Sequence, residues 1–152
     1  MKLLISLAAL VAPTAAYAAN QVSLQSTVFV ERNVAGSDGK MHIVQAAPKP
    51  VFPGDHLLFQ LNYHNLGEKP AVGFTVTNPI PASVGFLSSD SGAQYSVDGG
   101  KSWGPLAALR VKGTDGSSRA AGPDDITHVR WTFQKAIPAG GVGSVSFRGI
   151  VK

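Results

Sequence analysis

Cysteine is absent from this chain of 152 residues. The protein can therefore form no disulfide, hold no thiolate-bound metal and use no catalytic thiol, and no cysteine is present to carry a lipid. Charged residues are also few, at 14% of the chain, and the 13 basic side chains are scattered. That distribution is typical of a solubilising surface and argues against a nucleic-acid-binding stripe, while weak attraction to an anionic envelope surface stays open.

Long apolar runs are missing except near the N-terminus, where Lys2 precedes the run Leu3–Ala12. A helix that spans a bilayer needs about 20 residues, so this run is too short to cross one. Together with the small-x-small triplet Ala16–Ala18, it is typical of a secretory signal peptide. We expect residues 1–18 to be removed, with an uncleaved anchor helix as the alternative, and residues 19–152 to form a single exported domain without a transmembrane segment.

Alternation of apolar and polar residues runs through the rest of the chain and predicts strands. Strands are predicted over residues 22–30, 41–46, 56–65, 71–77, 84–87, 94–97, 101–103 with 106–111 continuing it, 126–133 and 145–151. Turns rich in Gly, Pro and Asp separate them, including a polar turn over Arg32–Lys40 and the longest polar loop, Lys112–Asp125. The pattern predicts an all-β fold, an immunoglobulin-like antiparallel β-sandwich of about seven to nine strands.

Turn residues recur around these strands in three short motifs. They are Pro53, Gly54 and Asp55 with Asn65 and Gly67 at the two ends of one strand, Pro79 and Pro81 after another, and Pro138 and Gly140 before the last. In their order and spacing these motifs resemble the DUF11 family of bacterial envelope proteins, also called the conserved repeat domain. The resemblance runs over roughly Val22–Val151.

This resemblance implies an immunoglobulin-like sandwich in an exported protein of the periplasm or cell surface. It implies no enzymatic activity, no cofactor and no catalytic residues. Family domains usually occur in tandem arrays, whereas this chain holds a single copy, and this departure argues against a role as one unit of a stalk.

A second pattern, S-x-D-x-G-x-x-W, is formed by Ser96, Asp98, Gly100 and Trp103. It resembles the Asp-box of sialidase propellers and several other folds. We expect a structural turn, in which the Asp98 carboxylate accepts backbone N–H groups and the indole packs beneath a hairpin. Sialidase activity is not expected, because the arginine triad and the nucleophile of that family are not recognisable here.

Other candidate sites are weaker. His56 and His64 share a strand face but lie about 27 Å apart at 3.4 Å per residue, and His42 or His128 would add only one imidazole to either. Asp115, Asp124 and Asp125 lack the spacing of a calcium loop. Ser37–Lys40 spells the S-x-x-K of penicillin-recognising enzymes, but in a polar turn without partner motifs. We therefore predict no catalytic residue, no metal and no cofactor.

The sequence thus predicts an exported, non-catalytic module that acts by binding or structural association in the cell envelope. The expected partner is an envelope protein or polysaccharide, not nucleic acid, and the expected contact surface is the long polar loop with the neighbouring Asp-box hairpin. An unpaired edge strand is the other candidate surface. Two alternatives stay open: a carbohydrate-binding or enzyme-accessory protein that uses aromatics such as Trp103, Phe52 or Phe29, and a weak periplasmic metal binder through the histidines.

Overall fold

In a computed structural model, which describes residues 21–47 and 50–152, the chain folds into ten β-strands with two short 3₁₀ turns. No α-helix occurs in these described ranges, and every strand pairing is antiparallel. The prediction of an all-β antiparallel sandwich is confirmed, with ten strands in place of about seven to nine. The expected signal peptide, residues 1–18, lies outside the described residues.

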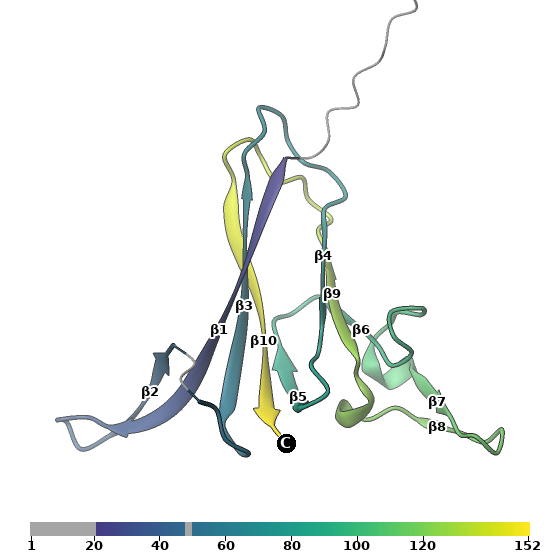
Figure 1. Ribbon diagram of the computed structural model, residues 1–152. Coiled ribbons are helices and arrows are strands. Elements are labelled where there is room, and N and C mark those ends of the chain that lie inside the picture. Colours follow the sequence, from purple (N-terminus) through teal and green to yellow (C-terminus); the bar gives the residue numbers. More distant parts are fainter. Residues whose placement is uncertain (1–20, 48–49) are drawn as a thin grey trace, which may run out of the picture.

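The strands form three sheets (Figure 1). The five-stranded sheet has the order β2 (Met41–Ala46), β1 (Val22–Ala35), β3 (His56–Asn65), β10 (Val142–Val151), β5 (Val84–Ser89). The three-stranded sheet has the order β4 (Thr75–Pro79), β9 (His128–Thr132), β6 (Ala93–Ser96). A two-stranded hairpin joins β7 (Arg110–Lys112) to β8 (Ser118–Ala120), and the 3₁₀ turns are η1 (Leu106–Ala108) and η2 (Pro123–Asp125).

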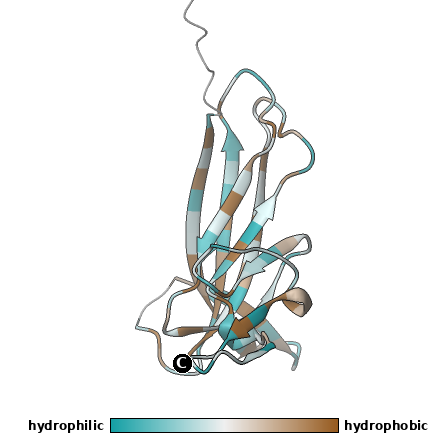
Figure 2. Ribbon diagram, turned by 90° about the vertical axis from the view of Figure 1, so that its right-hand side faces the viewer, coloured by the Kyte–Doolittle hydropathy of each residue, from teal (hydrophilic) through white to brown (hydrophobic). Residues whose placement is uncertain are grey.

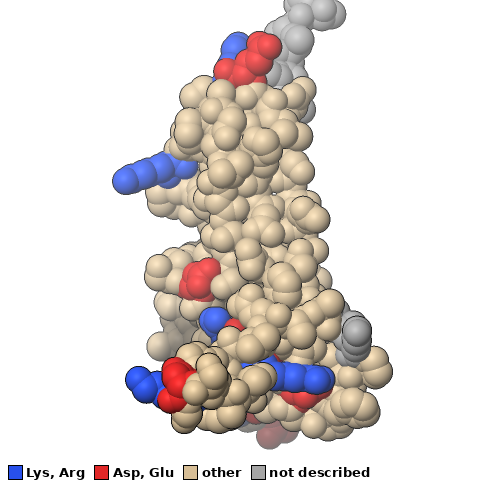
Figure 3. All heavy atoms as spheres, turned by 90° about the vertical axis from the view of Figure 1, so that its left-hand side faces the viewer, with Lys and Arg blue, Asp and Glu red and all other residues tan. Residues whose placement is uncertain are grey.

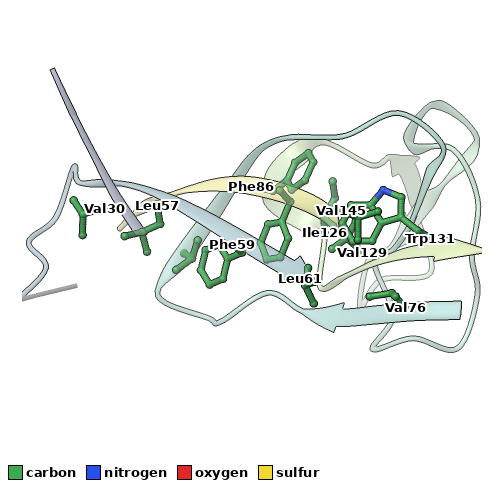
Figure 4. Packing of buried hydrophobic residues seen from close by; sticks show 12 residues of the cluster. Val30, Leu57, Phe59, Leu61, Val76, Phe86, Ile126, Val129, Trp131 and Val145 are labelled. Carbon is green, nitrogen blue, oxygen red and sulfur yellow. The ribbon is translucent and has the colours of Figure 1, made fainter. Parts of the chain in front are cut away.

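The core lies between the five-stranded and the three-stranded sheet (Figure 4). Because side chains alternate across a strand, the odd-numbered apolar residues of β3 and β9 point into this layer, whereas Leu58 is buried on the opposite face of β3. The buried cluster comprises Val30, Leu57, Phe59, Leu61, Val76, Val84, Phe86, Ile126, Val129, Trp131, Val145 and Phe147. At its centre the rings of Phe59 and Phe147 stack with centroids 4.4 Å apart. Figure 2 shows the resulting alternation of hydropathy along the strands.

The predicted turn over Arg32–Lys40 is wrong in its first half. β1 continues to Ala35 because, beyond its pairing with β3, it pairs with β2 over Val30–Ala35. The true turn is short, and Gly39 adopts a positive φ of 73° there. The predicted bounds of β2 and β3, residues 41–46 and 56–65, are confirmed.

The strand predicted over residues 101–103 is also absent. The Asp98 carboxylate accepts the backbone N–H groups of Lys101 and Ser102, so these donors are not available to a ladder. Pairing with β6 is limited to a single bridge between Tyr95 and Gly104. Likewise, the predicted continuation over 106–111 is η1 followed by β7, and the long loop over 112–125 contains β8 and η2.

Two hairpins project from the sandwich at the end where the C-terminus lies (Figure 1). One, which we call the β1–β2 ribbon, consists of Val30–Ala35 and Met41–Ala46. The other is the β7–β8 hairpin. Every residue of β2 and of β8 is exposed, so these strands contribute no buried side chain to the core. No helix in the described part of the chain is long and apolar enough to cross a membrane.

Candidate functional site

The turn at Pro53–Asp55 joins the start of β3 to the end of β10. Gly54 adopts a φ of +92°, a conformation that glycine tolerates best. The Asp55 carboxylate accepts the Phe52 N–H at 2.9 Å and closes the turn. The Gly54 N–H donates to the Val151 carbonyl, and the Val151 N–H donates to the Asp55 carbonyl, at 2.8 and 2.9 Å. This motif therefore clamps one end of the β3–β10 pair.

Asn65 clamps the other end. Its side chain is buried, and its amide donates to the carbonyls of Lys69 and Ile137, each at 2.9 Å, and of Pro138 at 3.1 Å. Its side-chain oxygen accepts the Gly67 N–H at 3.0 Å. The backbone of Asn65 exchanges hydrogen bonds with Gly140 and Gly141 as well. Two motifs that lie about 70 residues apart in sequence thus meet at one amide.

The two prolines after β4 mark the edge of the three-stranded sheet. Pro79 is the last residue of β4, opposite His128, and the Ile80 N–H after it still donates to the Thr127 carbonyl at 2.8 Å. Position 79 therefore has no bond to β9 to lose, and a proline there leaves the free edge of β4 without a donor. The chain then turns, with the Val84 N–H donating to the Pro81 carbonyl at 2.9 Å. All the turn motifs of the family resemblance therefore have structural contacts.

The Asp-box residues form a closed network of hydrogen bonds. The Asp98 carboxylate accepts the N–H groups of Lys101 and Ser102 at 3.0 and 2.9 Å and the Ser102 hydroxyl at 2.6 Å. The buried Ser96 hydroxyl donates to Asp98 at 2.7 Å and accepts the Gly100 N–H at 2.8 Å. These bonds, those from Ser102 first, lower the pKa of Asp98 far below its usual range.

Trp103 is bonded to the turn of the Asp-box and contacts two side chains of β9. Its indole N–H donates to the Gly100 carbonyl at 2.9 Å, and the guanidinium carbon of Arg130 lies 3.6 Å from its ring centroid. The imidazole of His128 contacts the Trp103 ring edge-on, with the two ring centroids 6.2 Å apart. One face of the indole is therefore occupied by a cation and is not free to stack on a sugar. Phe52, by contrast, is 62% exposed.

The structure does not bring the histidines together. His42 contacts Asp38 at 2.9 Å on the β1–β2 ribbon, and His128 contacts Thr127 at 3.0 Å. His56 and His64 lie near opposite ends of β3. Within residues 21–47 and 50–152, no three His, Asp or Glu side chains are grouped so that they could hold a metal ion.

The acidic residues of the long loop serve local structure. Asp125 pairs with Arg119 through two oxygens, at 2.7 and 2.6 Å, and accepts the Gly122 N–H at the start of η2. The Arg119 contact, followed by the Gly122 bond, lowers the pKa of Asp125 to about 2. Asp115 accepts the Ser117 N–H in the tip of the β7–β8 hairpin. Ser37–Lys40 forms the exposed turn of the β1–β2 ribbon.

A shallow groove of about 460 Å³ lies on the outer face of the five-stranded sheet. Its lining consists of Ser23, Gln25, Asn62, Tyr63, His64, Val142, Gly143 and Ser144. These residues belong to β1, β3 and β10, which are far apart in sequence and become neighbours only through the strand register. The face has a broad stretch without Lys, Arg, Asp or Glu (Figure 3). Such a lining offers amide and hydroxyl hydrogen bonds to a neutral polar ligand.

Sequence reasoning missed this groove and the exposure of the β1–β2 ribbon. The only signal for the ribbon was that β2, MHIVQA, alternates weakly and offers apolar side chains on both faces. No family model, no curated protein and no solved structure matches the chain. The resemblance to DUF11 therefore depends on the motifs alone.

Replacing Asn65 by leucine should destabilise the fold strongly. The substitution keeps the volume roughly but removes a buried donor from three carbonyls, so we expect a loss of about 3 kcal/mol in the free energy of unfolding. Chemical denaturation measures it. The matched control is Asn33→Leu, at an exposed site on β1, which should change the value by less than about 0.5 kcal/mol. Equal losses in both variants would contradict the assigned role of Asn65.

Asp98 should make stability fall in acid. Its pKa is lower in the folded state than the usual 3.8, so its contribution is present above pH 3.8 and is lost as the pH falls below that value. Asp98→Asn should lower stability at pH 7 and show a smaller further fall between pH 4 and pH 2. Denaturation at several pH values measures this, with Asp124→Asn as the control on the exposed η2 turn. An unchanged pH profile in Asp98→Asn would contradict the prediction.

Proposed function

We propose that this protein is an exported, non-catalytic module of the bacterial cell envelope, with an immunoglobulin-like sandwich, that acts by binding an envelope protein or polysaccharide. The observation that supports it best is that two hydrogen-bonded hairpins project from one end of the sandwich, each with one strand, β2 or β8, whose residues are all exposed. Strands that bury so little contribute little to the core, and loops and hairpins held by a rigid scaffold are where binding residues concentrate.

The β7–β8 hairpin is the surface that we assign to the envelope partner. It is held at its base by the Ala121 N–H, which donates to the Leu109 carbonyl at 3.0 Å, and by the Arg119–Asp125 pair. Its exposed side chains include Arg110 and Lys112, whose charges are not paired within the described residues. Because the hairpin is held at its base and exposes basic side chains, it is suited to contact a partner that carries acidic or polar groups.

Export is supported by the N-terminal sequence and by the DUF11 resemblance. The charged residue, apolar run and small-residue triplet before Ala19 are those of a signal peptide. A chain without cysteine needs no oxidising chemistry in order to fold, whichever compartment it folds in. Attachment to a larger envelope assembly would then come from the exposed hairpins.

Crosslinking capture from intact envelopes should test this proposal. The chain tagged after Lys152 should capture a specific envelope protein or polymer, and the double variant Arg110→Glu with Lys112→Glu should capture it at least about tenfold less. The control is Lys69→Glu with Lys135→Glu, which makes the same charge change elsewhere on the surface. Capture of no specific partner by the wild-type chain, or equal capture by both variants, would refute the proposed surface.

A second candidate function, carbohydrate binding, is favoured by the uncharged groove on the outer sheet face. Gln25 and Asn62 present amides there, and planar amides commonly orient sugar hydroxyls through paired hydrogen bonds. Binding of neutral oligosaccharides, screened on a glycan array, should be lost in Gln25→Ala with Asn62→Ala. It should persist in Gln94→Ala, at the exposed position of β6. An array without hits would rule this candidate out.

A further inference from the structure

In the two larger sheets, three of the four edge strands are guarded against further strand pairing. β4 ends at Pro79, and β6 exchanges two hydrogen bonds with Gly104 through Tyr95, at 2.9 and 3.1 Å. η2 lies against β5. Proteins commonly protect edges in this way, because an unpaired strand recruits strands from other chains. The opposite side of the five-stranded sheet, formed by the first half of β1 and then by β2, carries no such guard in the described part of the chain.

β2 is the unguarded strand that also exposes apolar side chains. Met41 and Ile43 are 64% and 67% exposed, and Val44 is exposed on the other face. β2 contains no proline, no Lys, Arg, Asp or Glu, and no bulge. Figure 1 shows that the β1–β2 ribbon leaves the body of the sandwich, so a strand can approach its edge without meeting the other sheet.

The hairpin geometry decides which backbone groups face outward. The Gly36 N–H donates to the Lys40 carbonyl at 2.7 Å, and the register continues with Val34 opposite His42. In an antiparallel ladder hydrogen-bonded pairs alternate, so the even-numbered residues of β2 bond to β1. The N–H and C=O groups of Met41, Ile43 and Gln45 therefore point away from β1, toward the free edge.

We propose that β2 pairs antiparallel with β2 of a second copy of this chain, about a two-fold axis at Ile43. In this register Ile43 lies opposite Ile43 of the other copy, and Met41 lies opposite Gln45. All three outward residues then have backbone partners, and no charged side chain of β2 faces a like charge. Two other registers are shifted by two residues. In one of them Met41 would lie opposite Ala47, beyond the end of β2, and in the other His42 would lie opposite His42 of the second copy.

This self-complementarity is what selects a second copy over an unrelated strand. The outward residues Met41, Ile43 and Gln45 are centred on Ile43, so each copy contributes the same residues to the contact. Such a contact is isologous and closes at two copies. Because β2 carries no Lys, Arg, Asp or Glu and exposes Met41, Ile43 and Val44, pairing would cover apolar surface on both copies without opposing like charges. The pairing continues the five-stranded sheet across two copies and needs no envelope partner, so it stands or falls independently of the proposed function.

Sedimentation of the purified chain over a range of concentrations should test the dimer. The wild type should form dimers as its concentration rises, and Ile43→Lys should raise the dissociation constant at least about tenfold, because it places like charges opposite each other. The matched control is Val34→Lys, an exposed apolar residue of the same ribbon that lies on β1, away from the free edge of β2, and whose backbone bonds to β2. Circular dichroism confirms that both variants fold.

Two further variants make the register itself testable. Ile43→Lys mixed with Ile43→Glu should restore the dimer, since opposite charges then meet across the axis. Because the chain has no cysteine, Ile43→Cys should crosslink under oxidation, as hydrogen-bonded strand pairs place Cα atoms about 5.5 Å apart. Val34→Cys should stay monomeric. A wild type that is monomeric at every concentration, a dimer that survives Ile43→Lys, or a mixture that stays monomeric would overturn the proposal.

Discussion

At one end of β3 the buried amide of Asn65 donates to carbonyls in the turn before β10, and at the other end the Pro53–Asp55 turn bonds to Val151. These two contacts fix the register of β3 against β10, strands that are about 80 residues apart in sequence. With that register set, Phe59 and Phe147 face each other and the rest of the core packs around them. A one-residue slip would place the two rings on opposite faces of the sheet, so that one of them would leave the core.

Where the chain leaves the sheets, polar side chains accept the backbone N–H groups that strand pairing would otherwise use. At the Asp-box, Ser96 and Asp98 take up backbone donors that strand pairing would otherwise need. The indole of Trp103 then bonds to the Gly100 carbonyl of the loop, and the guanidinium of Arg130, from β9, lies over the indole. The motif thus fixes a tight loop on the three-stranded sheet, beside the β7–β8 hairpin that we assign to the envelope partner.

The two projecting hairpins differ in chemistry although they share one end of the molecule. The β7–β8 hairpin carries basic side chains and suits contact with a polar or acidic partner, whereas the β1–β2 ribbon is apolar and uncharged at its edge. A dimer through the ribbon would leave the β7–β8 hairpin of each copy uncovered. Two such hairpins on one assembly would bind an envelope surface with higher avidity than one.

The sequence alone determined the positions of most strands, since alternation and turn residues are local properties of the chain. It also predicted that Asp98 and its neighbours form a structural turn, because that network closes within a few residues. The role of Asn65 was not readable beyond a motif, because its partners at Ile137 and Pro138 are brought near only by strand pairing. The extension of β1 past Val30 depended in the same way on its second partner, β2.

The groove and the free edge of β2 were decided by tertiary structure. Ser23, Asn62 and Ser144 line one surface because three separate strands lie side by side, and periodicity within one strand cannot state which strands are neighbours. Likewise, whether Met41 and Ile43 are core or surface depends on what lies across the sheet from them. Local preference determines where strands form, but burial and strand order are properties of the assembled sheets, set by the packing of residues distant in sequence.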